Sequence, residues 1–196
     1  MSEEIQQGAV SAGDQAFLSN LWEEHMRCEF TTHNTEDTLA TMVEDAYVNH
    51  IPVLTGGVGK EELREFYSKR FIPQMPPDTE NLLLSRTVGG DRIVDELLLR
   101  FTHTIPMDWL LPGIPPTGKR VEVPSVVVIQ FREGKMASEH IYWDQAGLLV
   151  QLGVLDAMHL PVLGSEQARK LLDPTVPMNR LMERADQRRE RSGPGN

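Results

Sequence analysis

The chain has 196 residues, of which 40% are apolar, and its formal net charge is −10. This length and composition suit one soluble globular domain with a sizeable core. The acidic balance argues against a general nucleic-acid-binding protein and against an anionic membrane surface as partner, because both contacts need a basic face.

The N-terminal residues do not read as a targeting segment. Residues 1–13 are expected to be disordered, and the opening is acidic and polar instead of basic and then apolar. No apolar run approaches the roughly 20 residues that span a bilayer. We therefore expect a cytoplasmic protein.

The first predicted helix begins at Asp14, which can cap it, and runs to Phe30. Its apolar residues recur at helical spacing and form a core face: Leu18, Leu21, Trp22 and Met26. A second short helix is predicted to begin at Thr35. Residues 46–50 then form a strand that a proline ends, which puts His50 at a strand end.

The following part of the chain alternates strands with turns. A glycine-rich loop over residues 56–59 and a helix over residues 60–67 come first. Four strands are then predicted, at Asn81 to Val88, Ile93 to Thr104, Ser125 to Arg132 and Met136 to Asp144. Three helices followed by a meander of strands indicate an α+β fold.

Residues 106–124 interrupt this rhythm, because they contain five prolines and cannot form a central strand throughout. A long, proline-stiffened excursion beside a sheet is a natural pocket rim. Its apolar cluster has no other core to join, so we expect it to fold over the pocket mouth. The cluster comprises Trp109, Leu110, Leu111 and Ile114.

The C-terminal part begins with a helix predicted over residues 145–152. A segment of mixed charges follows and ends in a frayed helix. We therefore divide the sequence into a domain over residues 14–156 and an extension over residues 157–196.

Three histidines fall within predicted strands or at their ends: His50, His103 and His140. The period of two puts His103 on the same face as Phe101, at the end of an otherwise apolar row that would line an apolar cavity. In the last strand the same alternation groups His140 with Tyr142 and Asp144. That face is therefore rich in proton donors and acceptors.

Asp144 is a candidate general base. A carboxylate in an apolar cavity has its pKa raised by desolvation, toward the range useful for proton transfer near neutral pH. Histidine needs little shift to act in the same way, so His50 and His103 are candidate partners. On spacing alone, Asp144 could equally cap the helix that begins at Gln145, and each histidine could be a hydrogen-bonded structural residue.

A metal site is not expected. No pair of histidines has metal-ligand spacing on one helix, although His50, His103 and Asp144 could converge in space. The single cysteine, Cys28, excludes a multi-cysteine zinc site and an internal disulfide framework. No serine stands in a nucleophile-elbow context, so a serine triad has no support.

Three blocks of the sequence, taken in order, carry a family resemblance. They are AYVNHIP at residues 46–52, GIPPTGK at residues 113–119 and EHIYWDQAGLLVQLG at residues 139–153. Together they resemble the SnoaL-like polyketide (ester) cyclase family, over about Phe17 to Leu155. The segment 160–173 resembles a branch of it sometimes labelled carboxymethylenebutenolidase.

The resemblance implies a fold like that of nuclear transport factor two and ketosteroid isomerase, a cone with one pocket between helices and a concave, antiparallel-rich sheet. It implies no cofactor, no metal and a homodimer or larger assembly. Family cyclases close a ring by an intramolecular aldol reaction, and Asp144 matches their acid/base aspartate. The residues expected to contact substrate are His140, Tyr142, Trp109, Phe101 and Leu110.

Three functions follow, because a fold alone does not select a reaction. The first is cofactor-independent acid/base proton transfer on a small cyclic or polyketide-like carbonyl substrate, with Asp144 as base and His50 or His103 as partner. The second is hydrolysis of an ester, lactone or epoxide by water activation. The third is a non-catalytic small-molecule binding module.

We also expect a homodimer through the outer sheet face, since residues 126–131 supply apolar side chains to both faces.

Overall fold

The computed structural model describes residues 12–192. Its helices are α1 (Ala12–Phe30), α2 (Thr35–Ala40), α3 (Gly59–Phe66), the single turns η1 (Tyr67–Phe71) and η2 (Ile72–Gln74), α4 (Gln145–Gln151), α5 (Glu166–Leu172) and α6 (Arg180–Ser192). Its strands are β1 (Met42–His50), β2 (Thr55–Val58), β3 (Glu80–Val88), β4 (Arg92–Thr102), β5 (Arg120–Arg132) and β6 (Lys135–Trp143). The predicted disorder of residues 1–13 falls almost wholly outside the described residues.

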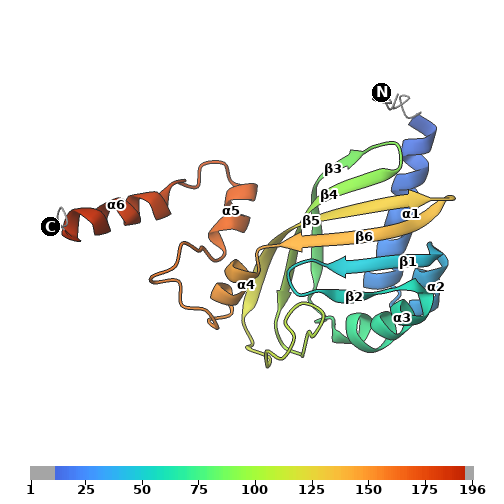
Figure 1. Cartoon of the computed structure of the whole chain (residues 1–196), viewed down its shortest axis with the longest axis horizontal. Coiled ribbons are helices and arrows are strands. Elements are labelled where there is room, and N and C mark those ends of the chain that lie inside the picture. Colours follow the sequence, from blue (N-terminus) through green and yellow to red (C-terminus); the bar gives the residue numbers. More distant parts are fainter. Residues whose placement is uncertain (1–11, 193–196) are drawn as a thin grey trace, which may run out of the picture.

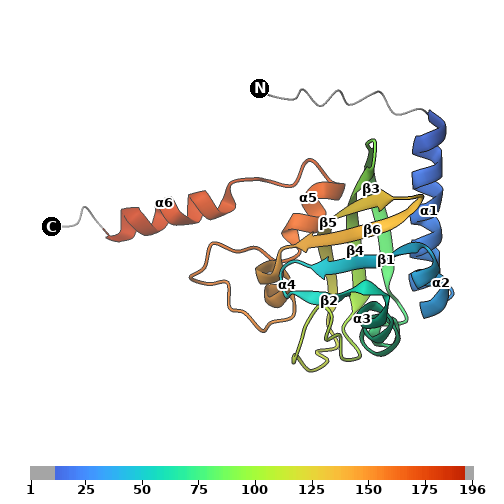
Figure 2. The same ribbon diagram turned by 45° about the vertical axis from the view of Figure 1, so that its right-hand side comes forward.

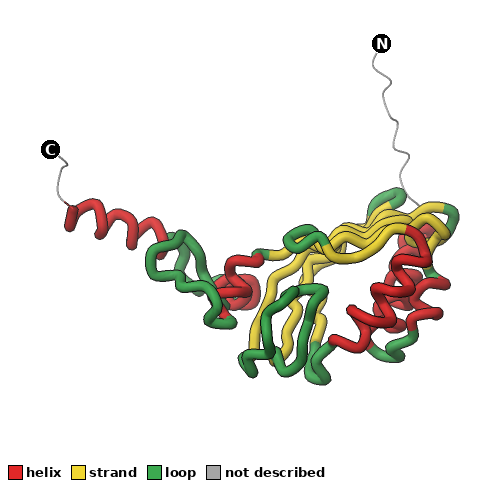
Figure 3. The backbone as a smooth tube through the Cα atoms, turned by 60° about the horizontal axis from the view of Figure 1, so that its bottom comes forward, coloured by secondary structure: helices red, strands yellow, loops and turns green. Residues whose placement is uncertain are grey.

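The six strands form one sheet in the order β2-β1-β6-β5-β4-β3. Neighbouring strands are antiparallel except β1 and β6, which run parallel. The sheet is curved, and α1, α2 and α3 lie together on one side of it (Figures 1 and 3). The predicted α+β class, with an antiparallel-rich sheet packed against N-terminal helices, is confirmed.

The C-terminal part of the chain leaves the sheet. α4 and α5 contact β5, whereas α6 extends away from it (Figures 1 and 2). Arg184 of α6 donates hydrogen bonds to the carbonyl oxygens of Ala157 and Leu160. None of the described helices is both long enough and apolar enough to cross a membrane.

The glycine-rich segment 56–59 was expected to be a loop, but most of it belongs to the edge strand β2. Gly56 lies opposite Asn49 of β1. A Cβ atom on Gly56 would lie 2.0 Å from the carbonyl oxygen of Val48, and its φ is +139°. A glycine is needed there because any side chain would separate the two backbones.

β5 begins at Arg120, earlier than predicted, and it accommodates Pro124. The first part of β5 pairs only with β4, because β6 ends opposite it at Trp143. On this free edge the backbone N–H of Glu122 donates to Gln151 Oε1 at 2.9 Å. Pro124 is two residues further on and has the same orientation, so its missing N–H removes no bond to β6.

The core lies between α1 and the sheet. Four residues of α1 recur at spacings of four, three and four, which puts them on one helical face. They are Leu18, Trp22, His25 and Glu29, and all four are buried. Two of the four are therefore ionisable side chains within an apolar stripe.

Candidate active site

A cavity of about 50 Å³ lies between α1 and the sheet. Aromatic side chains form much of its wall, among them Trp22, Phe30, Phe71 and Trp109. Its polar groups are Glu29, His50, Asn81, Ser125 and Glu139. An apolar chamber with a few polar groups is typical of a small-molecule site.

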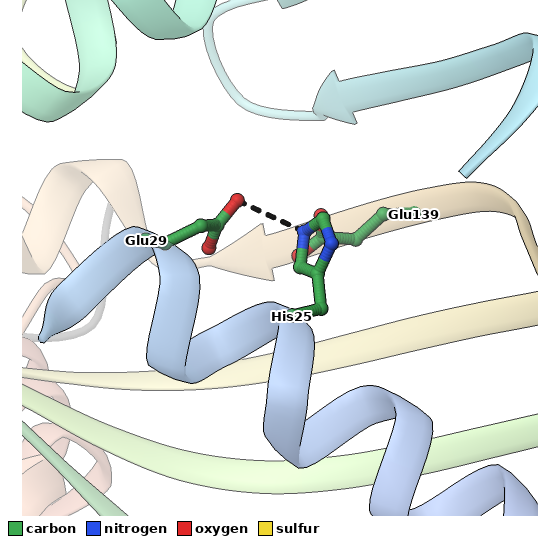
Figure 4. Close-up of side chains that lie close together, drawn as sticks. All are labelled: His25, Glu29 and Glu139. Carbon is green, nitrogen blue, oxygen red and sulfur yellow. Dashed lines mark hydrogen bonds and ion pairs between the residues drawn. The ribbon is translucent and has the colours of Figure 1, made fainter. Parts of the chain in front are cut away.

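His25 and Glu29 enter this region from the same face of α1, one helical turn apart. Their exposed fractions are 0% and 3%. His25 Nε2 lies 3.0 Å from Glu29 Oε1 (Figure 4). The two side chains therefore serve as hydrogen-bond partners for each other in the interior, as buried ionisable groups require.

The tautomer of His25 follows from a chain of hydrogen bonds. The hydroxyl of Thr41 donates to the carbonyl oxygen of Thr38 at 2.6 Å. Its only hydrogen is thereby used, so Thr41 Oγ1 accepts from His25 Nδ1 at 2.7 Å. Since Nδ1 carries a hydrogen, the contact between Nε2 and Glu29 needs one further proton. His25 and Glu29 form a dyad that shares this proton.

Glu139 of β6 faces the dyad from the sheet (Figure 4). A carboxylate oxygen of Glu139, one of Glu29 and a ring nitrogen of His25 lie within 4.8 Å of one another. The side chain of Glu139 is 6% exposed. Burial, and then the charge of Glu29, raises the pKa of Glu139 well above its ordinary value. Glu139 is therefore held as a carboxylic acid in a range where an ordinary glutamate is ionised.

Tyr67 completes this cluster. Its hydroxyl lies 3.5 Å from His25 Nε2. Burial, together with the charges of Glu29 and Glu139, raises the pKa of Tyr67 well above its ordinary value. Tyr67 therefore remains a hydrogen-bond donor beside the dyad.

Asp95 anchors α1 on the sheet beside the dyad. Trp22 Nε1 donates to Asp95 at 2.7 Å, and Arg86 donates two hydrogen bonds to the same carboxylate at 2.8 and 2.9 Å. This paired arrangement compensates the buried charge of Asp95. The ring of Trp22 stacks on His25 with centroids 5.5 Å apart, so the anchor also holds the imidazole.

His50 lines the cavity, as sequence analysis expected of a site residue. Its ring is surrounded by Phe66, Phe71, Trp109 and Trp143, with centroids 5.4 to 6.0 Å away. Burial lowers the pKa of His50 to about 4, although its bond to the Thr55 carbonyl acts in the opposite direction. Nδ1 lies 3.3 Å from that oxygen and carries the hydrogen, so Nε2 is an acceptor at neutral pH.

His103 lies just beyond β4 and is not among the residues that line the cavity. It is completely buried, and burial lowers its pKa. Its Nδ1 accepts from the backbone N–H of Thr117 at 3.4 Å. Its Nε2 has no hydrogen-bond partner within residues 12–192. These contacts make His103 a brace at the base of the proline-rich loop.

The predicted alternation of β6 is present, but the cavity lies on the other face. Glu139 and Ile141 line the cavity. His140 instead contacts the hydroxyl of Tyr47 at 2.7 Å, and Tyr142 is 42% exposed. The face that was expected to bind substrate is therefore the outer face of the sheet. The alternation pattern could not distinguish the two faces, because both carry polar residues.

Asp144 occupies the N-cap position of α4 and is exposed. Its side chain makes no capping hydrogen bond and accepts one from Gln167 Nε2 at 2.5 Å. The structure thus does not bring His50, His103 and Asp144 around one cavity. The assignment of Asp144 as the base stays a prediction, and its position gives it no support.

The proline-rich loop brings one of the four apolar residues expected over the pocket mouth, Trp109, to the cavity wall. Trp109 and Leu110 are buried, as is Leu111, and Trp109 lines the cavity. Thr55 Oγ1 donates to the carbonyl of Trp109 at 2.6 Å, and Trp109 Nε1 donates to the carbonyl of Gln74 at 3.3 Å. Phe101 and Leu110 are core residues and do not line this cavity.

Three of the groups in this site were not identified from sequence: His25, Glu29 and Glu139. The same three donor atoms could hold a cation only by displacing the proton between His25 and Glu29. The expectation of a metal-free site stays a prediction.

Comparison with known proteins gives one family match. Residues 19–152 match the family described as SnoaL-like polyketide cyclase. No curated protein shows significant similarity to the chain.

Several solved structures share the fold. TsrD from Streptomyces laurentii is 22% identical, with 72% of this chain and 98% of that chain covered and a TM-score of 0.59. A candidate SnoaL-like polyketide cyclase from Jannaschia sp. CCS1 is 19% identical, with 76% and 100% covered and a TM-score of 0.59. SalBIII, described as an epoxide hydrolase/cyclase-like enzyme of salinomycin pyran ring formation, is 16% identical, with 67% and 93% covered and a TM-score of 0.52.

Proposed function

The chain belongs to the SnoaL-like polyketide cyclase family, and from this premise we propose that it catalyses cofactor-independent acid/base proton transfer on a small carbonyl substrate. Glu29, in its dyad with His25, is the base, and Glu139 is the acid. One observation carries the proposal: two buried carboxyl groups, one of them paired with a histidine of fixed tautomer, meet at an apolar cavity.

The cluster holds protons in the distribution that such a reaction needs. Nδ1 of His25 donates to Thr41, and the next proton lies between Nε2 and Glu29. Glu139 holds its own proton because burial and the charge of Glu29 disfavour its ionised form. The site therefore presents one group that accepts a proton and one that donates a proton. Two titratable groups whose environments separate their roles are a common mark of acid/base catalysis.

The proposed step conserves its protons. Glu29 removes a proton from the carbon next to a substrate carbonyl, and Glu139 gives its proton to the carbonyl oxygen, so an enol forms. The enol then reacts in one of two ways. Its carbon attacks a second carbonyl of the same substrate, which closes a ring, or the enol is protonated at a different carbon, which isomerises the substrate. The new oxygen or carbon receives the proton from Glu29 and Glu139 regains one, which restores the cluster.

Access to the site requires the loop that carries Trp109 to move. The cavity of about 50 Å³ is smaller than the roughly 300–1,000 Å³ of typical ligand sites. Asp108, next to Trp109, accepts hydrogen bonds from Arg70 and from Gln74 at 3.1 and 3.2 Å. These contacts are near the surface, so the loop can open without disturbing the dyad.

A carbon-acid probe tests the proposal without knowledge of the substrate. 5-Nitrobenzisoxazole opens when a base removes its carbon-bound proton, and the nitrophenolate product is followed by absorbance. Glu29→Gln should lower the rate about 100-fold or more, as expected for a lost general base. Glu139→Gln should lower it less, since the acid only assists this reaction. Asp144→Asn should leave the rate unchanged.

The opposite pattern would overturn the assignment. If Asp144→Asn abolishes the reaction and Glu29→Gln does not, Asp144 is the base. Glu61→Gln serves as the matched control, because Glu61 is exposed in the first turn of α3. If no variant differs from the wild-type protein in rate, neither Glu29 nor Asp144 is the base and the acid/base proposal is wrong.

Hydrolysis by water activation is the second candidate. The cavity has room for about three to five water molecules on the scale of about 10–15 Å³ each, next to the two carboxyl groups. An acid and a base side by side can open an epoxide or a lactone by the same division of roles. Incorporation of ¹⁸O from labelled water into the product of a model epoxide, styrene oxide, would favour this reaction over proton transfer at carbon.

We also propose that the chain forms a homodimer through the outer face of the sheet. Apolar side chains on this face are 37 to 42% exposed: Val94, Val126 and Tyr142. Val126 lies opposite Tyr142 on the neighbouring strand, so they form a continuous surface. A second copy would remove this surface from water.

A further inference from the structure

The cavity has an unusual charge balance. Glu29, Glu139 and the imidazole of His50 line it, and neither lysine nor arginine does so within the described residues. Glu29 and Glu139 also form a cluster with His25, which lies behind the cavity wall. With His25 protonated and both glutamates ionised, the cluster would carry one net negative charge. The raised pKa of Glu139 favours its protonated form, which removes that charge.

The carboxyl group of Glu139 is also free of internal partners. Burial and the charge of Glu29 raise its pKa, and no hydrogen bond from residues 12–192 contributes to that shift. The side chain is nevertheless more than nine-tenths buried and lines the cavity. The carboxyl group therefore keeps its hydrogen-bonding capacity for a ligand in the cavity.

The walls opposite this acceptor are aromatic. Trp22, Phe30, Phe71 and Trp109 line the same cavity, together with the thioether of Met26. Aromatic faces attract cations through their quadrupole. Such walls do not suit an anion, which the two carboxyl groups would repel as well.

From this combination we infer that the cavity binds a small organic cation, an alkylammonium group whose N–H donates to the Glu139 carboxylate while its carbon atoms contact the aromatic walls. Binding of this cation does not require the proposed reaction, although both would use the same cavity. The cation replaces the proton of Glu139 and restores the same charge balance.

The size of the cavity limits the ligand. At about 10–15 Å³ for each water-sized atom, 50 Å³ holds about three to five atoms. Isopropylammonium has four non-hydrogen atoms, so the cavity can hold it at its present volume. 2-Propanol has the same shape without the charge, so the two compounds form a matched pair.

Isothermal titration calorimetry of the full chain with isopropylammonium chloride and with 2-propanol tests the inference. The cation should bind at least about 10-fold more tightly than the alcohol, which is the factor that one ion pair or one to two cation–π contacts provide. Glu139→Gln should reduce this ratio, because only the aromatic walls then favour the cation, and Glu61→Gln should leave it unchanged. Equal affinity for both compounds in the wild-type protein would overturn the inference.

A second measurement needs no variant. Because the cation replaces a proton, its binding should release up to one proton per ligand, seen as a heat that differs between buffers of different ionisation enthalpy. The titratable groups that surround Glu139 are His25 and Glu29 on α1, Tyr67 on η1 and His50 on β1. Binding without proton release at every pH between 5 and 8 would contradict the role of Glu139.

The two proposals can fail separately. Binding of isopropylammonium without turnover of 5-nitrobenzisoxazole would leave the cation site and remove the acid/base function. Turnover without preference for the cation would do the reverse. Inhibition of turnover by isopropylammonium, and not by 2-propanol, would show that both use one cavity.

Discussion

Replacing Glu139 by glutamine should change how the stability of the protein depends on pH. The pKa of Glu139 is raised in the folded protein, mainly by burial, from an ordinary value of 4.5. Below about pH 4.5 both the folded and the unfolded chain hold this proton, so its contribution to stability is fully present. As the pH rises, the unfolded chain releases the proton and the folded protein keeps it. The wild-type protein therefore loses stability until the folded pKa is reached.

The size of this effect follows from linkage. One proton held by the folded state alone lowers the free energy of unfolding by about 1.4 kcal/mol per pH unit. For a chain of this length, that corresponds to a fall in Tm of about 3–6 °C per pH unit. Glutamine keeps the shape of the protonated side chain and cannot ionise, so Glu139→Gln should lack this slope. Carboxyl groups outside the cluster of His25, Glu29 and Glu139 titrate equally in both proteins and cancel in the difference.

Thermal unfolding of the two proteins between pH 5 and pH 8 measures the effect. The Tm of Glu139→Gln relative to the wild-type protein should rise across this range and become constant above the folded pKa. The exposed Glu61→Gln variant should show a difference that does not change with pH. Parallel Tm curves for Glu139→Gln and the wild-type protein would refute the reasoning, since Glu139 would then be ionised in the fold.

Four further outcomes are expected. Trp109→Ala should lower stability by about 3–5 kcal/mol in thermal unfolding and let the larger probe 5-nitrobenzisoxazole bind with a lower KM, because it opens the cavity roof. Asp144→Asn should change neither Tm nor rate by more than a small factor, and a 100-fold loss of rate would restore its predicted role. Thr41→Val should move the ring hydrogen of His25 from Nδ1 to Nε2, seen in ¹⁵N NMR, whereas Thr41→Ser should not. Light scattering should give twice the chain mass of 22.1 kDa, and Val126→Lys should give the monomer mass; a monomeric wild-type protein would exclude the dimer.

The fold was predictable to a large extent because its main signals are local. Helical spacing marked the buried face of α1 through Leu18 and Trp22, whereas Leu21 and Met26 are only partly buried. Alternation with turns marked the four strands of the meander. The proline-rich segment was expected to cover the pocket, and Trp109 does line the cavity. The parallel pairing of β1 with β6 was not predictable in this way, because it joins strands that are far apart in the sequence.

The site was predictable only in part. Alternation correctly separates Glu139 from His140, but it cannot say which face meets the cavity when both faces carry polar residues. Asp144 was proposed as the base from its strand-end position, its grouping with His140 and Tyr142, and a family match. None of these indicates the direction in which the chain leaves β6 to form α4. His50 was singled out because a histidine at a strand end is unusual, and it does line the cavity.

The groups that were missed do have a signal in the sequence, and it is a violation of pattern. His25 and Glu29 fall on the helical face that Leu18 and Trp22 begin, where apolar residues would pack at lower cost. A buried ionisable pair commonly costs as much in desolvation as it gains in attraction, so apolar residues of similar size would often be more stable there. Ionisable side chains that persist at three such places, on α1 and on β6, are therefore better explained by the chemistry of the cavity than by folding. The same reading predicts that replacing both His25 and Glu29 by leucine would raise Tm while removing the reaction, whereas a purely structural role would lower Tm.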